Sequence, residues 1–196
     1  MITVLSSPKP GSGTSTTAAL LAVTASIDAP TTLVDLCGDQ PTVFNCPTTA
    51  GRIDISERLT VHNAVDDTLG EQLDIVHGID PDRHVVIDAG HATHPIIAEL
   101  PTGTVNRWVI RPCYLALRRA LACATRPDEV IVLDELGRAL RADDVTAVLA
   151  APVVATIEVH PNIARLIDAG LLPHQPPRHI VRALTGLLRT KESTQP

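Results

Sequence analysis

The chain has 196 residues, of which 44% are hydrophobic and only 2% aromatic, and its formal net charge is −6. This length fits one globular domain with a single buried core. With so few aromatic residues the core must consist of Val, Ile, Leu and Ala, and a base-stacking platform for single-stranded nucleic acid is not expected.

Cysteine usage and the apolar runs indicate a soluble, cytoplasmic protein. The four cysteines lack the C-x-x-C spacing of a metal or redox motif, which favours reduced thiols. The first residues lack the basic flank and long apolar run of a signal peptide, and the longest apolar runs are shorter than a membrane span. Most basic residues lie in the second half of the chain, whereas acidic residues prevail in the first.

The first part of the chain predicts a strand, a glycine-rich turn and a helix. ITVL at 2–5 is a short apolar strand, and a helix is expected over 15–26. TTLVDL at 31–36 predicts a second buried strand. The following residues, up to about 82, are less periodic, and here we predict a helix near 60–70 and a strand over 73–78.

A regular alternation of apolar strands and helices follows. It predicts strands at 84–90, 105–111, 129–134 and 152–159, and helices at 114–124, 142–151, 162–172 and 178–190. Short apolar strands separated by helices indicate a parallel sheet with right-handed crossovers. The sequence therefore predicts one α/β domain over 1–190, with a doubly wound, mostly parallel sheet between two layers of helices, and a polar tail over 191–196.

The glycine-rich turn has the composition of a phosphate-binding loop. Backbone N–H groups in such a turn, together with the dipole of the following helix, favour a bound anion. Gly11 and Gly13 allow close approach of the backbone to a ligand. The hydroxyls of Ser15 and Thr16 are suited to bond a phosphate or its magnesium.

The segment KPGSGTST at 9–16 resembles the deviant Walker A loop of the MinD/ParA family of P-loop ATPases, K-G-G-x-G-K-T-T. Lys9 falls on the signature lysine of that family. The strands ending at Asp35 and Asp88 and the later segment ATIEVHPNIARLIDAGLL occur in the family's order. The resemblance implies a P-loop NTPase-like fold, a homodimer, a protein partner, and ATP or ADP with Mg²⁺ as cofactor. It further implies a nucleotide site at Lys9, Gly11, Ser12, Gly13, Thr14, Ser15 and Thr16, and a magnesium and switch set of Ser15, Asp35 and Asp88.

The chain departs from the family pattern at several functional positions. Thr14 replaces the loop lysine that neutralises the β- and γ-phosphates, and a hydroxyl brings no charge. Cys37 stands where the family has the acid that orients the attacking water, and Asp39 is the candidate substitute. Pro10 removes one N–H donor from the loop, and Asp134 stands where the family often has a base-recognising Asn. We therefore expect weak cofactor binding, and we assign no catalytic residue.

These observations predict a degenerate MinD/ParA-like protein, a positioning or regulatory factor with weak or no ATP hydrolysis that works through dimerisation and a protein partner. One alternative is a slow, active ATPase of the same family in plasmid or chromosome partition, or in cell-division or pilus positioning. Another is a partition protein that binds DNA non-specifically through the arginine-rich second half. A third uses the basic amphipathic helix 178–190 at a membrane surface, although packing of its apolar face on the sheet is favoured.

Two further constellations near the loop carry weaker signals. His91 and His94 follow Asp88, but no other ligands have a recognisable spacing, so no metal site is expected at this pair. Cys37 is either a low-pKa thiol near a helix N-terminus or an inert substitution, and the inert interpretation is favoured.

Overall fold

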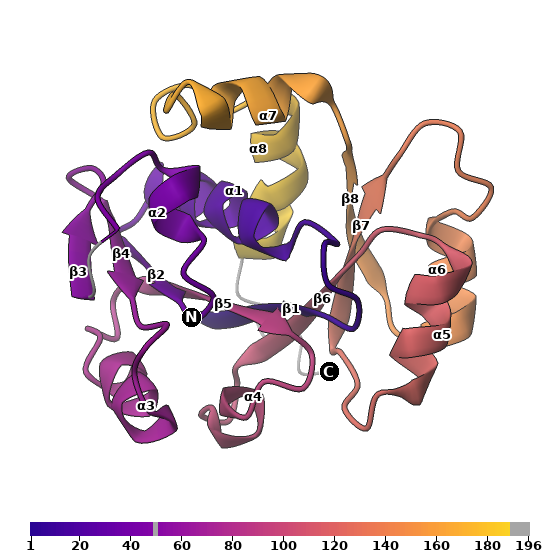
Figure 1. Ribbon diagram of the computed structural model, residues 1–196, viewed down its shortest axis with the longest axis horizontal. Helices are drawn as coiled ribbons and strands as arrows, with labels where there is room; N and C mark the ends of the chain where they lie inside the picture. Colours follow the sequence, from indigo (N-terminus) through magenta and orange to yellow (C-terminus); the bar gives the residue numbers. More distant parts are fainter. Residues whose placement is uncertain (49–50, 189–196) are drawn as a thin grey trace, which may run out of the picture.

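The computed structural model describes residues 1–48 and 51–188, which form one eight-stranded sheet with helices on both faces (Figure 1). The strand order is β3-β4-β2-β5-β1-β6-β7-β8. Neighbouring strands are parallel except for the pair β3 and β4. The strands are β1 (Ile2–Ser7), β2 (Thr31–Asp35), β3 (Gly51–Asp54), β4 (Leu59–Asn63), β5 (His84–His91), β6 (Val105–Ile110), β7 (Glu129–Asp134) and β8 (Val153–Glu158).

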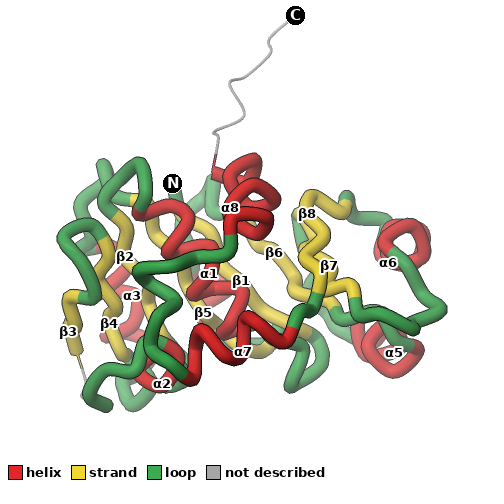
Figure 2. The backbone as a smooth tube through the Cα atoms, turned by 90° about the horizontal axis from the view of Figure 1, so that it is seen from above, coloured by secondary structure: helices red, strands yellow, loops and turns green. Residues whose placement is uncertain are grey.

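The helices form two layers, as Figures 1 and 2 show from two directions. One face of the sheet carries α1 (Thr14–Ser26), α2 (Gln40–Val43), α7 (Pro161–Asp168) and α8 (Arg178–Thr185), which a short 3₁₀ turn (Gly186–Leu188) continues. The other carries α3 (Leu69–His77), α4 (Ile96–Glu99), α5 (Tyr114–Ala122) and α6 (Ala142–Leu149). The predicted doubly wound, three-layer α/β fold is confirmed.

Helix α1 lies at the centre of its layer and is buried on nearly all sides. Its apolar residues contact the sheet, and its outer side is covered by α8. Ile180, Leu184 and Leu187 of the C-terminal segment are all at most 5% exposed. The apolar face that made this segment a candidate membrane contact is therefore part of the core. None of the helices within residues 1–48 and 51–188 has the length and apolar character needed to cross a membrane.

The prediction for the least periodic region was wrong. Residues 59–63 form β4, which pairs in parallel with β2, where we expected a helix near 60–70. The expected strand over 73–78 is instead part of helix α3. Thr68 caps this helix, because its hydroxyl accepts from Glu71 N while the Glu71 carboxylate accepts from Thr68 N. This capping box was readable in the sequence.

The last two predicted helices are shorter than expected. The helix expected over 162–172 ends at Asp168, because Gly170 adopts a left-handed φ of 65° and turns the chain. Leu172 then packs into the core from a loop, with 0% exposure. The helix expected over 178–190 ends at Thr185. Its last two residues and the predicted tail at 191–196 lie outside the described residues.

Candidate functional site

The glycine-rich turn joins β1 to α1 at the carboxyl ends of the parallel strands, the edge where α/β sheets bind ligands. Gly11 and Gly13 have left-handed φ values of 72° and 87°. Gly13 is the N-cap of α1 and supplies no side-chain hydrogen bond to the first turn. The N–H groups at the start of α1 are thus not capped by the side chain of the N-cap residue, and helix N-termini of this kind are suited to bind an anion.

Side chains of the loop contribute little positive charge to this anion site. The Lys9 ammonium lies 3.3 Å from the Pro10 carbonyl of the same loop. The Ser12 hydroxyl is buried and donates to the Lys9 carbonyl at 2.7 Å, so it stabilises the loop from within. Thr14 is the first residue of α1 and only 7% exposed. A phosphate in this loop would be bound mainly by backbone N–H groups and hydroxyls.

Three elements meet beside the loop through a buried glutamine that sequence analysis did not identify. Gln40, the first residue of α2, is 0% exposed. Its Nε2 donates to Asp88 Oδ2 at 2.8 Å and to the Ser15 carbonyl at 3.0 Å. The Ser15 hydroxyl in turn donates to Asp39 Oδ2 at 2.8 Å. Ser15 and Asp88, predicted to share a magnesium ion, are thus brought together: the Ser15 side chain interacts with Asp88, and the Gln40 amide bonds the Ser15 carbonyl and Asp88.

Asp35 organises the loop that follows β2. Its Oδ1 accepts from the backbone N–H groups of Cys37 and Gly38, each at 2.9 Å, and its Oδ2 accepts from Gln40 N at 2.9 Å. The carboxyl group is completely buried, and burial raises its pKa despite these three bonds. Asp35 therefore holds the backbone of the loop.

The Cys37 thiol packs against Asp88. Its Sγ lies 3.8 Å from Asp88 Oδ1 and 3.6 Å from the Asp88 carbonyl. Burial and the neighbouring carboxylates raise the pKa of the Cys37 thiol above its usual range, so the interpretation as a low-pKa, reactive thiol is wrong. A Cβ at Gly90 would lie 2.5 Å from Cys37 Sγ, so only glycine fits there beside the thiol.

The arrangement does not fit a magnesium ion. Among the described residues, Asp35, Cys37 and Asp88 have potential ligand atoms within 4.8 Å of one another, and this group includes neither His91 nor His94. Mg²⁺ requires oxygen ligands in near-octahedral geometry. Here both Asp35 oxygens accept backbone N–H bonds, the thiol is a soft ligand, and Asp88 faces an amide N–H.

Two cavities meet at the start of α1. The first, of about 520 Å³, is open to the glycine-rich loop; its lining includes Gly11, Thr14, Ser15, Cys37, Asp39, His91 and His94. The second, of about 430 Å³, extends between the ends of β7 and β8 and helix α7; its lining includes Arg111, Leu133, Glu135, Ile157, His160 and Ile163. Because Gly13 and Thr16 line both, the two cavities adjoin each other.

Sequence analysis did not predict the second cavity, because its lining comes from segments far apart in the chain. Asp134, predicted near the base of a nucleotide, does not line it and pairs instead with Arg141 at 3.0 Å. Arg111 does line it, and its buried Nε has no hydrogen-bond partner among residues 1–48 and 51–188. This guanidinium is the cationic group of the apolar cavity.

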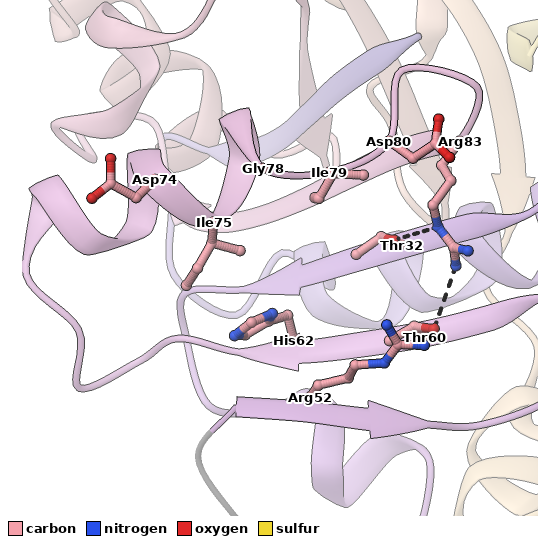
Figure 3. Close-up of a pocket in the computed structure, with 10 residues that line it drawn as sticks. All are labelled: Thr32, Arg52, Thr60, His62, Asp74, Ile75, Gly78, Ile79, Asp80 and Arg83. Atoms are coloured by element: carbon pink, nitrogen blue, oxygen red, sulfur yellow. Dashed lines mark hydrogen bonds between the residues drawn. The ribbon is translucent and has the colours of Figure 1, made fainter.

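A further cavity, of about 510 Å³, is separate from the glycine-rich loop (Figure 3). It lies between α3 and the face of β2 and β4 that is turned away from α1. Arg83 lines this cavity and donates to Thr32 Oγ1 at 2.9 Å and to Thr60 Oγ1 at 3.3 Å. Asp74 and Asp80 also line it, so positive and negative side chains are mixed in its lining. None of its lining residues belongs to the glycine-rich loop.

Several arginines of the second half are neutralised by close carboxylates. Arg107 is buried against Glu129 at 2.8 Å. On the surface, Arg138 pairs with Glu135 at 2.8 Å and Arg141 pairs with Asp134 at 3.0 Å. These three arginines do not add to a free basic surface of the kind that non-specific DNA binding uses. DNA binding by this half stays a prediction.

The buried carboxyl of Asp88 predicts a stability change with pH. Burial raises the pKa of Asp88 to about 6, so between pH 4 and 6 this carboxyl binds more protons in the folded chain than in the unfolded one. The contribution of Asp88 to the free energy of unfolding should therefore fall as pH rises through this window, by about 3 kcal/mol, and level off above it. Asp88→Asn removes this contribution. Urea titrations from pH 4 to 7.5 would contradict the assignment if both proteins showed the same pH dependence.

Solved structures with the same fold include a ParA family ATPase and the cell division protein MinD. A ParA family ATPase from Chlorobium tepidum TLS superposes with a TM-score of 0.78 at 17% identity, over 95% of this chain and 99% of that one. MinD in the MinC:MinD cell division complex of Aquifex aeolicus gives 0.74 at 14% identity, over 95% and 94%.

MinD of Pyrococcus horikoshii OT3, solved with Mg-ADP, gives 0.72 at 16% identity, over 95% and 93%. No protein-family model matches the chain, and no curated protein does. At these identities the similarity shows the fold alone. It is the P-loop NTPase-like fold that the Walker A-like loop predicted. The chain has the P-loop α/β fold of the ParA and MinD ATPases.

Proposed function

We propose that this chain is a degenerate MinD/ParA-like positioning or regulatory factor with weak or no ATP hydrolysis. It acts by dimerisation and by binding a protein partner. Its fold is that of a ParA family ATPase, a plasmid partition protein and the cell division protein MinD, and one of these structures is a complex of MinD with MinC. The glycine-rich loop and the two adjoining cavities support binding of a nucleotide, in which the phosphates lie at the loop and the base in the apolar cavity.

The observation that carries the loss of hydrolysis is the Cys37 thiol against Asp88. A P-loop ATPase needs a charged group on the β- and γ-phosphates and a polar group that orients the attacking water. Thr14 has no charge, and the Cys37 thiol has its pKa raised, so it is protonated at neutral pH and cannot act as a base. Loss of one such stabilising group costs on the order of 2–4 kcal/mol in the transition state.

Asp39 favours a second candidate function, a slow ATPase of the same family. Its carboxylate lines the cavity at the loop and accepts the Ser15 hydroxyl at 2.8 Å. In this candidate Asp39 orients the attacking water in place of the missing acid. Asp39→Asn would then abolish the residual turnover, whereas in a protein without hydrolysis the substitution has no activity to remove.

The test combines phosphate release with light scattering on the purified chain. We expect phosphate release at the level of a no-protein control, and a dimer by light scattering with or without ATP. Asp88→Ala is the matched variant for the release assay. Rapid phosphate release that Asp88→Ala abolishes would contradict the proposal, as would a monomer under all conditions.

A further inference from the structure

We propose that the side-chain amide of Gln40 takes the place of a divalent cation at the glycine-rich loop and holds the loop after β2 without metal. In nucleotide switches, a magnesium ion and the terminal phosphate hold such a loop, which is released when they are lost. The inference extends the proposed function by making the site independent of magnesium. Its test uses no nucleotide, so it succeeds or fails separately from nucleotide binding and hydrolysis.

The first argument is the position of the amide. Gln40 Nε2 lies 2.8 Å from Asp88 Oδ2, at the end of β5, and 3.0 Å from the Ser15 carbonyl, in the first turn of α1. A cation at this edge of the sheet would join the same two elements, but through the Ser15 hydroxyl, which here donates to Asp39. The amide is completely buried and donates both bonds, so it supplies the positive end of a dipole where a cation would supply charge.

The second argument is the orientation of that amide. Its Oε1 has no hydrogen-bond partner in the part of the chain that the structure describes. Turning the amide over would place Oε1 against Asp88 Oδ2, and two acceptors would then face each other in a buried site. The Asp88 carboxyl therefore fixes the amide with its donor group toward β5, although the carbonyl oxygen is left without a bond.

The third argument is that the neighbouring oxygens are also occupied by hydrogen bonds. Both oxygens of Asp35 accept backbone N–H groups of the loop, and Asp39 Oδ2 accepts the Ser15 hydroxyl. Together these bonds tie the loop after β2 to both α1 and β5. The loop is thus held by the chain's own donors, in the place where a switch loop requires an ion.

The decisive variant is Gln40→Glu, which has nearly the same shape. It places a second carboxylate beside Asp88, and two buried carboxylates repel each other unless a cation joins them. We expect the Tm of Gln40→Glu to fall in EDTA and to rise by roughly 5 °C or more in 10 mM MgCl₂ or MnCl₂, relative to NaCl of equal ionic strength. The wild-type Tm should be the same in all these solutions.

Gln72→Glu is the matched control. Gln72 is also a buried glutamine, 5% exposed, but its Nε2 donates to the Ala64 and Asp67 carbonyls and not to a carboxylate. The Tm of Gln72→Glu should also fall relative to the wild type, but MgCl₂ should not raise it. A Tm rise of several degrees for the wild type in MgCl₂ would overturn the proposal, as would a Gln40→Glu protein that responds to neither cation.

Hydrogen exchange provides a measurement that does not depend on the folding of Gln40→Glu. In the wild type, the amides of Cys37 and Gly38 should be protected to the same degree in EDTA and in MgCl₂, because Asp35 and Gln40 hold the loop in both. Gln40→Met, which keeps the size but removes the donor, should increase exchange at these amides at least tenfold. Protection in the wild type that requires magnesium would overturn the inference.

Discussion

Replacing Thr14 by lysine should increase the affinity for ATP between about thirtyfold and a thousandfold. A lysine brings a charge to the phosphates, and loss of one such contact costs on the order of 2–4 kcal/mol. Thr14 lines the cavity at the loop, so a longer side chain at this position can extend into it. The only basic residue that the loop itself has is Lys9, whose ammonium lies against the Pro10 carbonyl. Calorimetric titration with ATP and with ADP measures the change.

The matched control for this variant is Thr14→Gln, which has a long polar side chain without charge. Charge-assisted hydrogen bonds are about twice as strong as neutral ones, so Thr14→Gln should increase the affinity much less than Thr14→Lys. The gain should also decrease with added salt, because it is electrostatic. Equal affinities of the two variants, or no gain for Thr14→Lys, would argue against a phosphate site at this loop.

Replacing Arg107 by methionine should lower the free energy of unfolding by about 3–5 kcal/mol, because it removes one partner of a buried ion pair. The two side chains are 5% and 11% exposed, with Arg107 Nε 2.8 Å from Glu129 Oε2. Arg107 also donates to Thr3 Oγ1 at 3.2 Å and to the Leu187 carbonyl at 3.1 Å. It thereby joins β6 to β1, β7 and the 3₁₀ turn after α8, and urea unfolding measures the loss.

Arg52→Met is the control for this stability prediction. Arg52 pairs with Asp54 at 3.0 Å, but these side chains are 65% and 63% exposed. Exposed ion pairs contribute less than about 1 kcal/mol, so this variant should unfold at nearly the wild-type urea concentration. A similar small loss in Arg107→Met would mean that water reaches the Arg107–Glu129 pair.

The central part of the fold could be predicted from the sequence because its signals are local. Apolar runs of four to six residues ending in an acid predicted β2 and β5, and the glycines between β1 and α1 predicted the loop. Asp35 and Asp88 lie opposite each other in the register of these two parallel strands. Their closeness follows from the rule that parallel strands end at one edge of the sheet.

The region between β2 and β5 could not be predicted in the same way. The residues of β4 were expected to form a helix, and they form a strand because they pair with β2. A loop, a short helix and the edge strand β3 separate β4 from β2 along the chain. The start of α3 is an exception, since the capping box of Thr68 and Glu71 is a local signal. The cavity between β7, β8 and α7 likewise depends on how distant segments pack.

The groups present at the loop can be read from the amino-acid sequence: the glycines, Lys9, an uncharged Thr14, and a thiol at Cys37. How the neighbouring groups are used depends on the folded arrangement of the chain. It brings Gln40 between Ser15 and Asp88 and directs three backbone N–H groups at Asp35. The physical reason is that residue type sets which hydrogen bonds a group can make, whereas packing and burial decide which partners are within reach.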